Sequence, residues 1–165
     1  MTKPRIVKIS KLSAYGEERL LDHFEVLLPP GGPACSEMAF WEGPAKSAQA
    51  LVTTAPVGVS EALMRRMPSL KAVSCRGIGT DKIDLEAAKK LGIEVSTTPG
   101  VLTDCVADLA MGLLLDTARG LSASDRFVRA GHWLNGSFPL ATRVSGKRLG
   151  VLGLGQIGTA IARRA

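Results

Sequence analysis

Aromatic residues are scarce in this chain: they make up 4% of its 165 residues, whereas hydrophobic residues as a whole make up 45%. The core is therefore expected to be aliphatic and rich in alanine. Charge does not cluster either, because the 21 basic and 15 acidic residues are scattered along the sequence. The chain thus lacks the basic arm typical of nucleic-acid binding, and we predict no nucleic-acid partner.

Long apolar stretches and closely spaced cysteines are also missing. No apolar run reaches the ~18 residues that span a bilayer, and the first residues lead into a strand pattern rather than a secretory signal. Cys35, Cys75 and Cys105 are far apart and show no CxxC spacing, so we expect reduced thiols and no metal site. These absences predict a cytoplasmic protein with no membrane partner.

Short apolar segments alternate with helical patterns over the first hundred residues. Strands are predicted at 5–9, 25–28, 50–54, 70–74 and 93–96, and helices at 15–24, 60–67 and 85–91. Ser60 is the expected N-cap of the second helix, and Gly92 is expected to end the third. Residues 38–46 suit a broken helix. Such alternation is typical of a parallel sheet covered by helices on both faces, which predicts an α/β domain over residues 1–100.

The longest helical pattern runs from about residue 103 to 121. Its apolar residues, such as Leu109 and Leu113, recur in steps of three and four, and we interpret it as a packed connector between domains. Helix continues over 122–130, and an irregular segment with Trp133 follows at 131–139. An exposed aromatic loop often marks a partner surface; a loop folded onto its own domain is the alternative.

A glycine-rich motif closes the chain. Residues 148–152 have the pattern of an apolar strand, and Gly153-Leu154-Gly155-Gln156-Ile157-Gly158 gives GxGxxG before a helical pattern. In dinucleotide-binding folds these glycines permit a tight turn, close approach of a pyrophosphate and close packing of helix on strand. We predict a dinucleotide site, with a purely structural turn as the alternative.

A second glycine turn, Gly77-Ile78-Gly79, follows the strand predicted at 70–74. Ligands of open α/β sheets bind beyond the carboxyl ends of the strands, where backbone N–H groups can converge on an anion. We predict that the three residues bind a small carboxylate. The alternative is a tight strand-to-helix connection capped by Asp81.

Three segments, 74–85, 97–108 and 146–158, resemble in this order the D-isomer-specific 2-hydroxyacid dehydrogenase family, and GIGTDKID is most similar to its glyoxylate/hydroxypyruvate reductase branch. The resemblance implies a flavodoxin-like doubly wound parallel sheet, then the first strand-turn-helix of a Rossmann domain in residues 101–165. It implies a small 2-keto acid as substrate and NAD or NADP as cofactor, the preference being open because the residue that meets the ribose 2′ position is not in the sequence. It also implies a homodimer through the 101–140 region.

The resemblance also implies roles for individual residues. The backbone of residues 77–79 would hold the substrate carboxylate, Thr103 and Val106 would lie near the nicotinamide, and Gln156 and Ile157 would touch the pyrophosphate. Thr54 and Ile78 are expected to line the substrate pocket.

The family's catalytic Arg, Glu and His are expected beyond residue 165, so we expect the 165-residue chain to bind without turnover. Neither His23 nor His132 is placed to serve as the proton donor of the reaction. Arg76 is expected to point to solvent, and Cys75 and Cys105 are expected to be buried packing residues. The alternative function is a non-enzymatic dinucleotide-sensing or protein-interaction module of the same fold.

Overall fold

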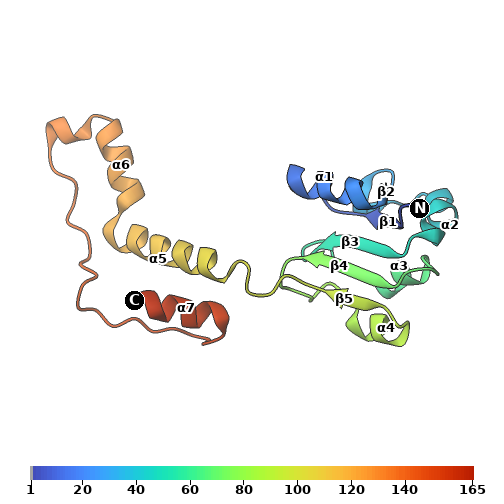
Figure 1. Cartoon of the computed structure of the whole chain (residues 1–165). Coiled ribbons are helices and arrows are strands. Elements are labelled where there is room, and N and C mark those ends of the chain that lie inside the picture. The colour runs from blue at the N-terminus through green and yellow to red at the C-terminus, as the bar shows by residue number, and fades with distance from the viewer. Residues whose placement is uncertain (1) are drawn as a thin grey trace. The chain divides into compact units, whose positions relative to one another are not determined.

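The computed structural model describes residues 2–165, which divide into two compact units, one ending at Pro99 and the other covering Gly100–Ala165. We call them the sheet unit and the helical unit. The sequence predicted a division after residue 100. Each unit is described separately below, and Figure 1 labels their elements.

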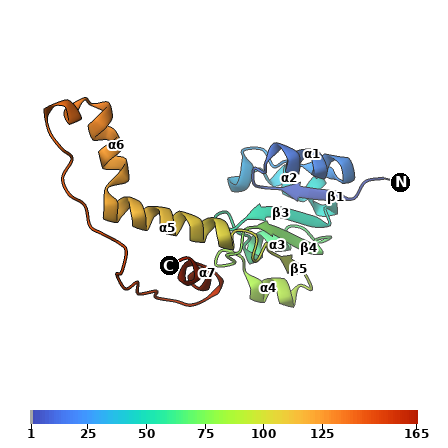
Figure 2. The ribbon, with the colours of Figure 1, turned by 60° about the vertical axis from the view of Figure 1, so that its left-hand side comes forward.

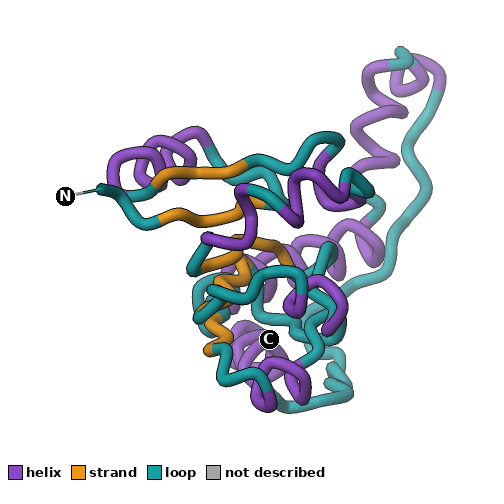
Figure 3. The backbone as a smooth tube through the Cα atoms, turned by 90° about the vertical axis from the view of Figure 1, so that its right-hand side faces the viewer, coloured by secondary structure: helices purple, strands orange, loops and turns teal. Residues whose placement is uncertain are grey.

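The sheet unit is built on five parallel strands. They are β1 (Arg5–Lys8), β2 (Glu25–Leu27), β3 (Ala50–Thr54), β4 (Ala72–Arg76) and β5 (Glu94–Ser96), and their order in the sheet is β2-β1-β3-β4-β5. Figure 3 shows the strands in orange among the helices that connect them. This is the flavodoxin-like order, so the predicted fold class of this unit is confirmed.

The core lies against one face of this sheet. Val7, Leu51 and Val73 are completely buried there, whereas Ser74, on the other face of β4, is exposed. They meet α2 (Met38–Glu42), the 3₁₀ turn η2 (Pro44–Ser47), α3 (Glu61–Arg65) and α4 (Leu85–Lys90). The predicted aliphatic core is found, with Trp41 as its one large aromatic side chain.

Short polar side chains cap three of the helices of the sheet unit. Ser13 caps α1 (Ala14–His23), and Ser60 caps α3 as predicted, its hydroxyl accepting the N–H of Leu63. The helix α4 is capped by Asp84, whose carboxylate accepts the N–H of Ala87 at 2.9 Å. The alternative in which Asp81 would cap this connection is therefore wrong. A second 3₁₀ turn, η1 (Gly32–Ala34), follows β2.

The helical unit contains α5 (Thr103–Arg119), α6 (Leu121–Arg129), the 3₁₀ turn η3 (His132–Asn135) and α7 (Gln156–Arg164). The predicted helix over 103–130 is interrupted at Gly120, whose φ of 64° is left-handed and ends α5. After η3 the chain runs without regular structure to α7, which packs along α5 (Figure 2). No helix in residues 2–165 has the length and apolarity that crossing a membrane requires.

Two expectations about the second half are wrong, and a third holds only in part. Residues 148–152 form no strand, because a strand needs a neighbouring ladder and the described part of this unit offers none. The helix α5 packs against α7 and buries Ala107, whereas its apolar residues Leu109 and Leu113 are 61% and 56% exposed. Cys105 is exposed on the same helix.

Candidate functional site

The carboxyl-terminal edge of the sheet carries a cavity of about 500 Å³, which we call the sheet-edge cavity. Its lining residues follow β1, β2 and β3 or end β4, and they include Ser10, Lys11, Pro29, Thr54 and Arg76. Within the sheet, β2 lies beside one edge of β1 and β3 beside the other. The cavity therefore lies where the strand order reverses, which is where open α/β sheets bind ligands.

Hydroxyl groups and cations add polar atoms to a cavity lining that is otherwise mainly apolar. Thr54, predicted to line a substrate pocket, is 8% exposed, and its hydroxyl lies 3.2 Å from that of Ser10. The Lys8 ammonium donates to the Glu17 carboxylate at 2.6 Å. This bond, helped by the Leu12 N–H, holds the pKa of Glu17 below its ordinary value. The charge of Lys8 is thus balanced within the unit.

The glycine turn after β4 offers fewer free donors than the sequence suggested. Gly77 has a φ of 140°, which only glycine adopts without strain. Its N–H donates to the Thr98 hydroxyl at 3.1 Å, and its carbonyl accepts the Thr98 N–H at 3.0 Å. Within residues 2–165 the N–H groups of Ile78 and Gly79 have no acceptor, so these two remain available to an anion.

The helical unit has its own cavity, of about 640 Å³, which we call the helix-end cavity. Thr103, at the start of α5, and Gly155 and Gln156, at the start of α7, line it together with Asp104 and Arg163. Two helix N-termini thus border one space. Each has unpaired N–H groups and the positive end of a helix dipole, which together favour a negatively charged ligand.

The three glycines of GxGxxG differ in what surrounds them. Gly153 has a φ of 92°, and a Cβ on Gly158 would lie 1.9 Å from the Gly153 carbonyl oxygen. A Cβ on Gly155 would meet nothing within 4 Å. The backbone is therefore tightly folded at the first and third glycines and open at the second, where a pyrophosphate could approach. No side chain caps α7, so these residues fit a dinucleotide.

An arginine near the end of α7 holds the two helices together. The Arg164 guanidinium lies 3.0 Å from the Asp104 carboxylate and 2.6 Å from that of Asp108, both on α5. The Asp104 contact first, and then Asp108, raise the pKa of Arg164 above its ordinary value. These bonds help to keep the start of α7 beside Thr103.

The structure brings together some of the predicted cofactor residues and not others. Thr103, Gly155 and Gln156 line the helix-end cavity, whereas Val106 does not and is 40% exposed along α5. Gly153, Ile157 and Gly158 lie in the turn and first helical residues without lining the cavity.

Sequence reasoning missed several lining residues. Arg163 falls seven residues after Gln156, on the same helix face, and this spacing could have revealed it. Lys11 and Arg76 line the sheet-edge cavity. Arg76 is exposed as expected and lines the cavity as well. The signal for both was their position just beyond or at the end of a predicted parallel strand.

The histidines and cysteines lie outside both cavities. His23 ends α1 on the surface, and the His132 ring lies 5.5 Å from that of Phe127. Burial raises the pKa of the Cys75 thiol, which is 1% exposed in the core as expected. No group of metal-binding side chains occurs in the part of the chain that the structure describes.

Comparison with known proteins gives consistent matches. The family described as "D-isomer specific 2-hydroxyacid dehydrogenase, catalytic domain" matches residues 9–164. The chain is 41% identical over 169 aligned residues to glyoxylate/hydroxypyruvate reductase A of Arabidopsis thaliana, covering 97% of this chain and 50% of that protein. It is 39% identical to hydroxyphenylpyruvate reductase of Plectranthus scutellarioides, with the same coverages.

Solved structures agree. The chain resembles a 2-hydroxyacid dehydrogenase of Ketogulonicigenium vulgare with a TM-score of 0.93 and 38% identity, covering 99% of this chain and 51% of that one. An NADPH-dependent glyoxylate/hydroxypyruvate reductase of Sinorhizobium meliloti, in complex with NADP and malonate, gives a TM-score of 0.83 and 35% identity, with coverages of 99% and 50%. The chain thus spans about half the length of the relatives that it matches.

Proposed function

The chain belongs to the family of D-isomer specific 2-hydroxyacid dehydrogenases, and on this basis we propose that it is part of an NAD(P)-dependent reductase of small 2-keto acids such as glyoxylate or hydroxypyruvate. In this proposal the sheet unit binds the substrate and the helical unit binds the dinucleotide. The bound dinucleotide would supply the hydride for reduction of the keto group. The relatives named above as glyoxylate/hydroxypyruvate reductases support this substrate class.

The observation that carries the proposal is the helix-end cavity. Thr103 and Gly155–Gln156 are separated by about fifty residues of sequence, yet they border one cavity at two helix N-termini. The N–H groups at the start of α7 would bind the pyrophosphate, and Arg163 would add a positive charge at the same wall. The NADP complex of the Sinorhizobium meliloti relative supports a nicotinamide dinucleotide as the ligand.

The sheet-edge cavity suits the substrate. Residues 77–79 do not line the cavity, although they directly follow Arg76, which does, and Ile78, predicted to line the substrate pocket, is 55% exposed. The free N–H groups of Ile78 and Gly79 would hold a carboxylate at this edge of the sheet, with Thr54 and Ser10 as hydroxyl donors in the cavity. Reduction of a keto group also needs a proton donor with a pKa near neutrality. Of the described residues, no His or Glu lines either cavity. This chain is therefore proposed to bind and position the reactants, and its binding role fits the dinucleotide-sensing alternative as well.

Titration of the chain with NADH and NADPH tests the proposal, followed by the change in nicotinamide fluorescence. We expect saturable binding of at least one of them, and an affinity reduced by about tenfold or more in Gly158→Ala, because the new Cβ would collide with the Gly153 carbonyl and displace the turn. Gly112→Ala, in α5 with open space at its Cβ, is the matched control.

The same samples distinguish binding from catalysis. We expect no oxidation of NADH or NADPH with glyoxylate or hydroxypyruvate. Failure of both dinucleotides to bind would contradict the proposed function. Turnover by the 165-residue chain would contradict the proposal that this chain binds the reactants without supplying the proton donor.

Two further features complete the proposal. A homodimer is proposed to form through the 101–140 region, where Leu109, Leu113, Trp133 and Leu134 are all more than half exposed. A cytoplasmic location is proposed as well, in keeping with the free thiols of Cys35, Cys75 and Cys105.

A further inference from the structure

The sheet-edge cavity carries more positive charge than one carboxylate needs. Lys8, Lys11 and Arg76 all line it, and no acidic side chain of residues 2–165 does so. Lys8 is paired with Glu17. Lys11 and Arg76 have no ion pair or side-chain hydrogen bond anywhere in the described chain. Two cations are therefore left without a partner at the rim of a ligand cavity.

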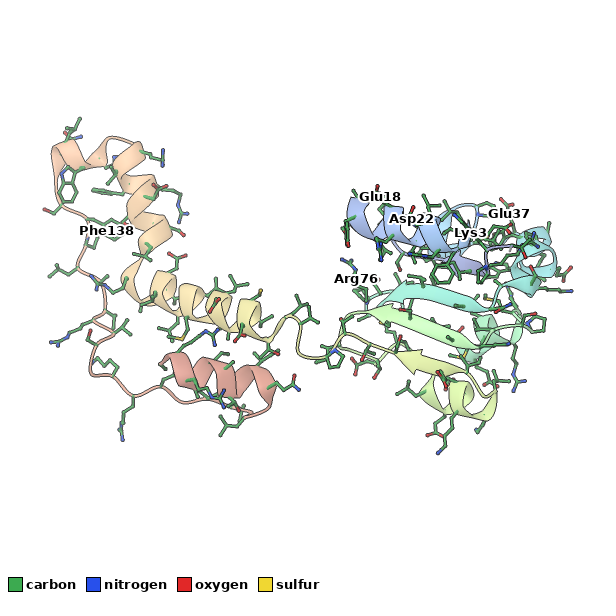
Figure 4. The ribbon with its side chains drawn as sticks, in the orientation of Figure 1. Lys3, Glu18, Asp22, Glu37, Arg76 and Phe138 are labelled. Atoms are coloured by element: carbon green, nitrogen blue, oxygen red, sulfur yellow. The ribbon has the colours of Figure 1, made fainter. Side chains whose placement is uncertain are left out.

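Arg76 occupies a defined place in this cavity. It is the last residue of β4 and lies opposite Thr54 in the parallel ladder with β3, and Figure 4 shows it at that edge of the sheet. The Thr54 hydroxyl and its Ser10 partner lie on the same cavity wall. The turn with the free Ile78 and Gly79 N–H groups begins at the next residue. A ligand held by that turn would have the Arg76 guanidinium beside it.

Lys11 comes to the cavity from a different strand. It lies three residues beyond the end of β1, which pairs with β3, so its ammonium and the Arg76 guanidinium enter from opposite sides of β3. A guanidinium binds carboxylates and phosphates through two parallel hydrogen bonds, and an ammonium adds a point charge. The cavity, at about 500 Å³, has room for a substrate much longer than glyoxylate.

We propose that Arg76 and Lys11 form a second anion subsite, which selects 2-keto and 2-hydroxy acids whose tail carries a carboxylate or a phosphate. The subsite rests on the proposed function, because the first carboxylate is placed at the glycine turn. Its effect is on specificity: both cations are exposed to water, so a neutral tail gains nothing from them, whereas an anionic tail pairs with them.

Binding of three 2-hydroxy acids to the full chain tests this subsite by calorimetry or by NMR titration. D-Lactate has a methyl tail, D-malate a carboxylate tail and D-3-phosphoglycerate a phosphate tail. We expect at least one of the two acids with an anionic tail to bind about tenfold or more tightly than D-lactate, as charge-assisted hydrogen bonds imply. The order of D-malate and D-3-phosphoglycerate then distinguishes a carboxylate from a phosphate ligand.

Substitutions assign the preference to the two cations. Arg76→Gln is expected to remove most of the preference, and Arg76→Gln with Lys11→Gln is expected to abolish it. Arg66→Gln removes an equal charge from an exposed site in the same unit and should leave the preference intact.

Three results would overturn the subsite: equal binding of all three acids, no binding of either acid with an anionic tail, or an equal loss in Arg66→Gln. None of them concerns the dinucleotide. If the chain binds NADH but shows no preference among the acids, the subsite fails and the proposed function stands. If it prefers acids with an anionic tail but binds neither dinucleotide, the subsite stands and the proposed dinucleotide site fails.

Discussion

At the scale of single residues, glycines determine the geometry of the sheet edge. Gly58, in the turn after β3, has a φ of 73°, and a Cβ there would lie 2.2 Å from the Lys82 carbonyl oxygen. This close approach lets Val59 and Lys82 share a backbone hydrogen bond of 2.9 Å. The turn after β3 is thereby joined to the loop that follows the Gly77–Gly79 turn, and Val57 of the first turn lines the sheet-edge cavity.

Gly58→Ala should therefore destabilise the sheet unit by about 3 kcal/mol, because it adds a backbone clash to the strain of a left-handed residue. Gly92→Ala is the control. Gly92 also has a positive φ, of 68°, but open space at its Cβ, so its cost should be about 1 kcal/mol. Denaturant unfolding followed by the fluorescence of buried Trp41, in a Trp133→Phe background, measures both. Equal effects of the two substitutions would contradict the role of the close approach.

Individual residues also show where sequence reasoning ends. The Gly77–Gly79 turn was found because glycines after a strand are a local signal. The hydrogen bond that the Gly77 N–H donates to the Thr98 hydroxyl could not be predicted, because it joins residues 21 positions apart. Arg76 is exposed as expected, but its place in the lining of the sheet-edge cavity could not be predicted, because it is set by β1 and β3 and by the order of the strands, which no local pattern contains.

At the scale of elements, prediction succeeded where the pattern is local or the element is buried. The five strands of the sheet and the Ser60 cap follow from short apolar runs and one hydroxyl. The segment 148–152 has an equally good strand pattern but forms no strand, because a ladder requires a neighbour. The Phe127 and Phe138 rings, 5.4 Å apart, show the loop after η3 folded partly onto its own unit (Figure 4), although Trp133 remains 58% exposed.

The exposed face of α5 gives the prediction at this scale. Val106, Leu109 and Leu113 recur at helical spacing and are 40%, 61% and 56% exposed. If a second copy covers this face, Leu113→Glu should convert a dimer to a monomer, because a carboxylate would be buried without a partner. Leu21→Glu, on α1 at 58% exposure, should leave the mass unchanged. Sedimentation of both variants and the parent chain decides, and a parent chain that stays monomeric would contradict the proposed interface.

At the scale of the whole molecule, each of the two units has its own cavity suited to an anion. The sheet unit holds cations, hydroxyls and free N–H groups at one strand edge, and the helical unit holds two helix N-termini and the glycine turn at one cavity. Both arrangements suit anions: a carboxylic acid in the first and a pyrophosphate in the second. The sequence predicted both glycine turns. It did not predict the ion pairs of Arg164 with Asp104 and Asp108. These pairs link α7 to α5 and so help to place Thr103 beside the glycine turn that precedes α7.

The most direct test of the central claim is the position of dinucleotide binding in the isotope-labelled chain, followed by amide chemical shifts during titration with NADH or NADPH. We expect the amides of Thr103, Gly155, Gln156 and Thr159, which line the helix-end cavity, to shift together and saturate with one dissociation constant. Shifts that are absent from both helix N-termini, or confined to the sheet unit, would contradict the assignment of the helix-end cavity as the dinucleotide site.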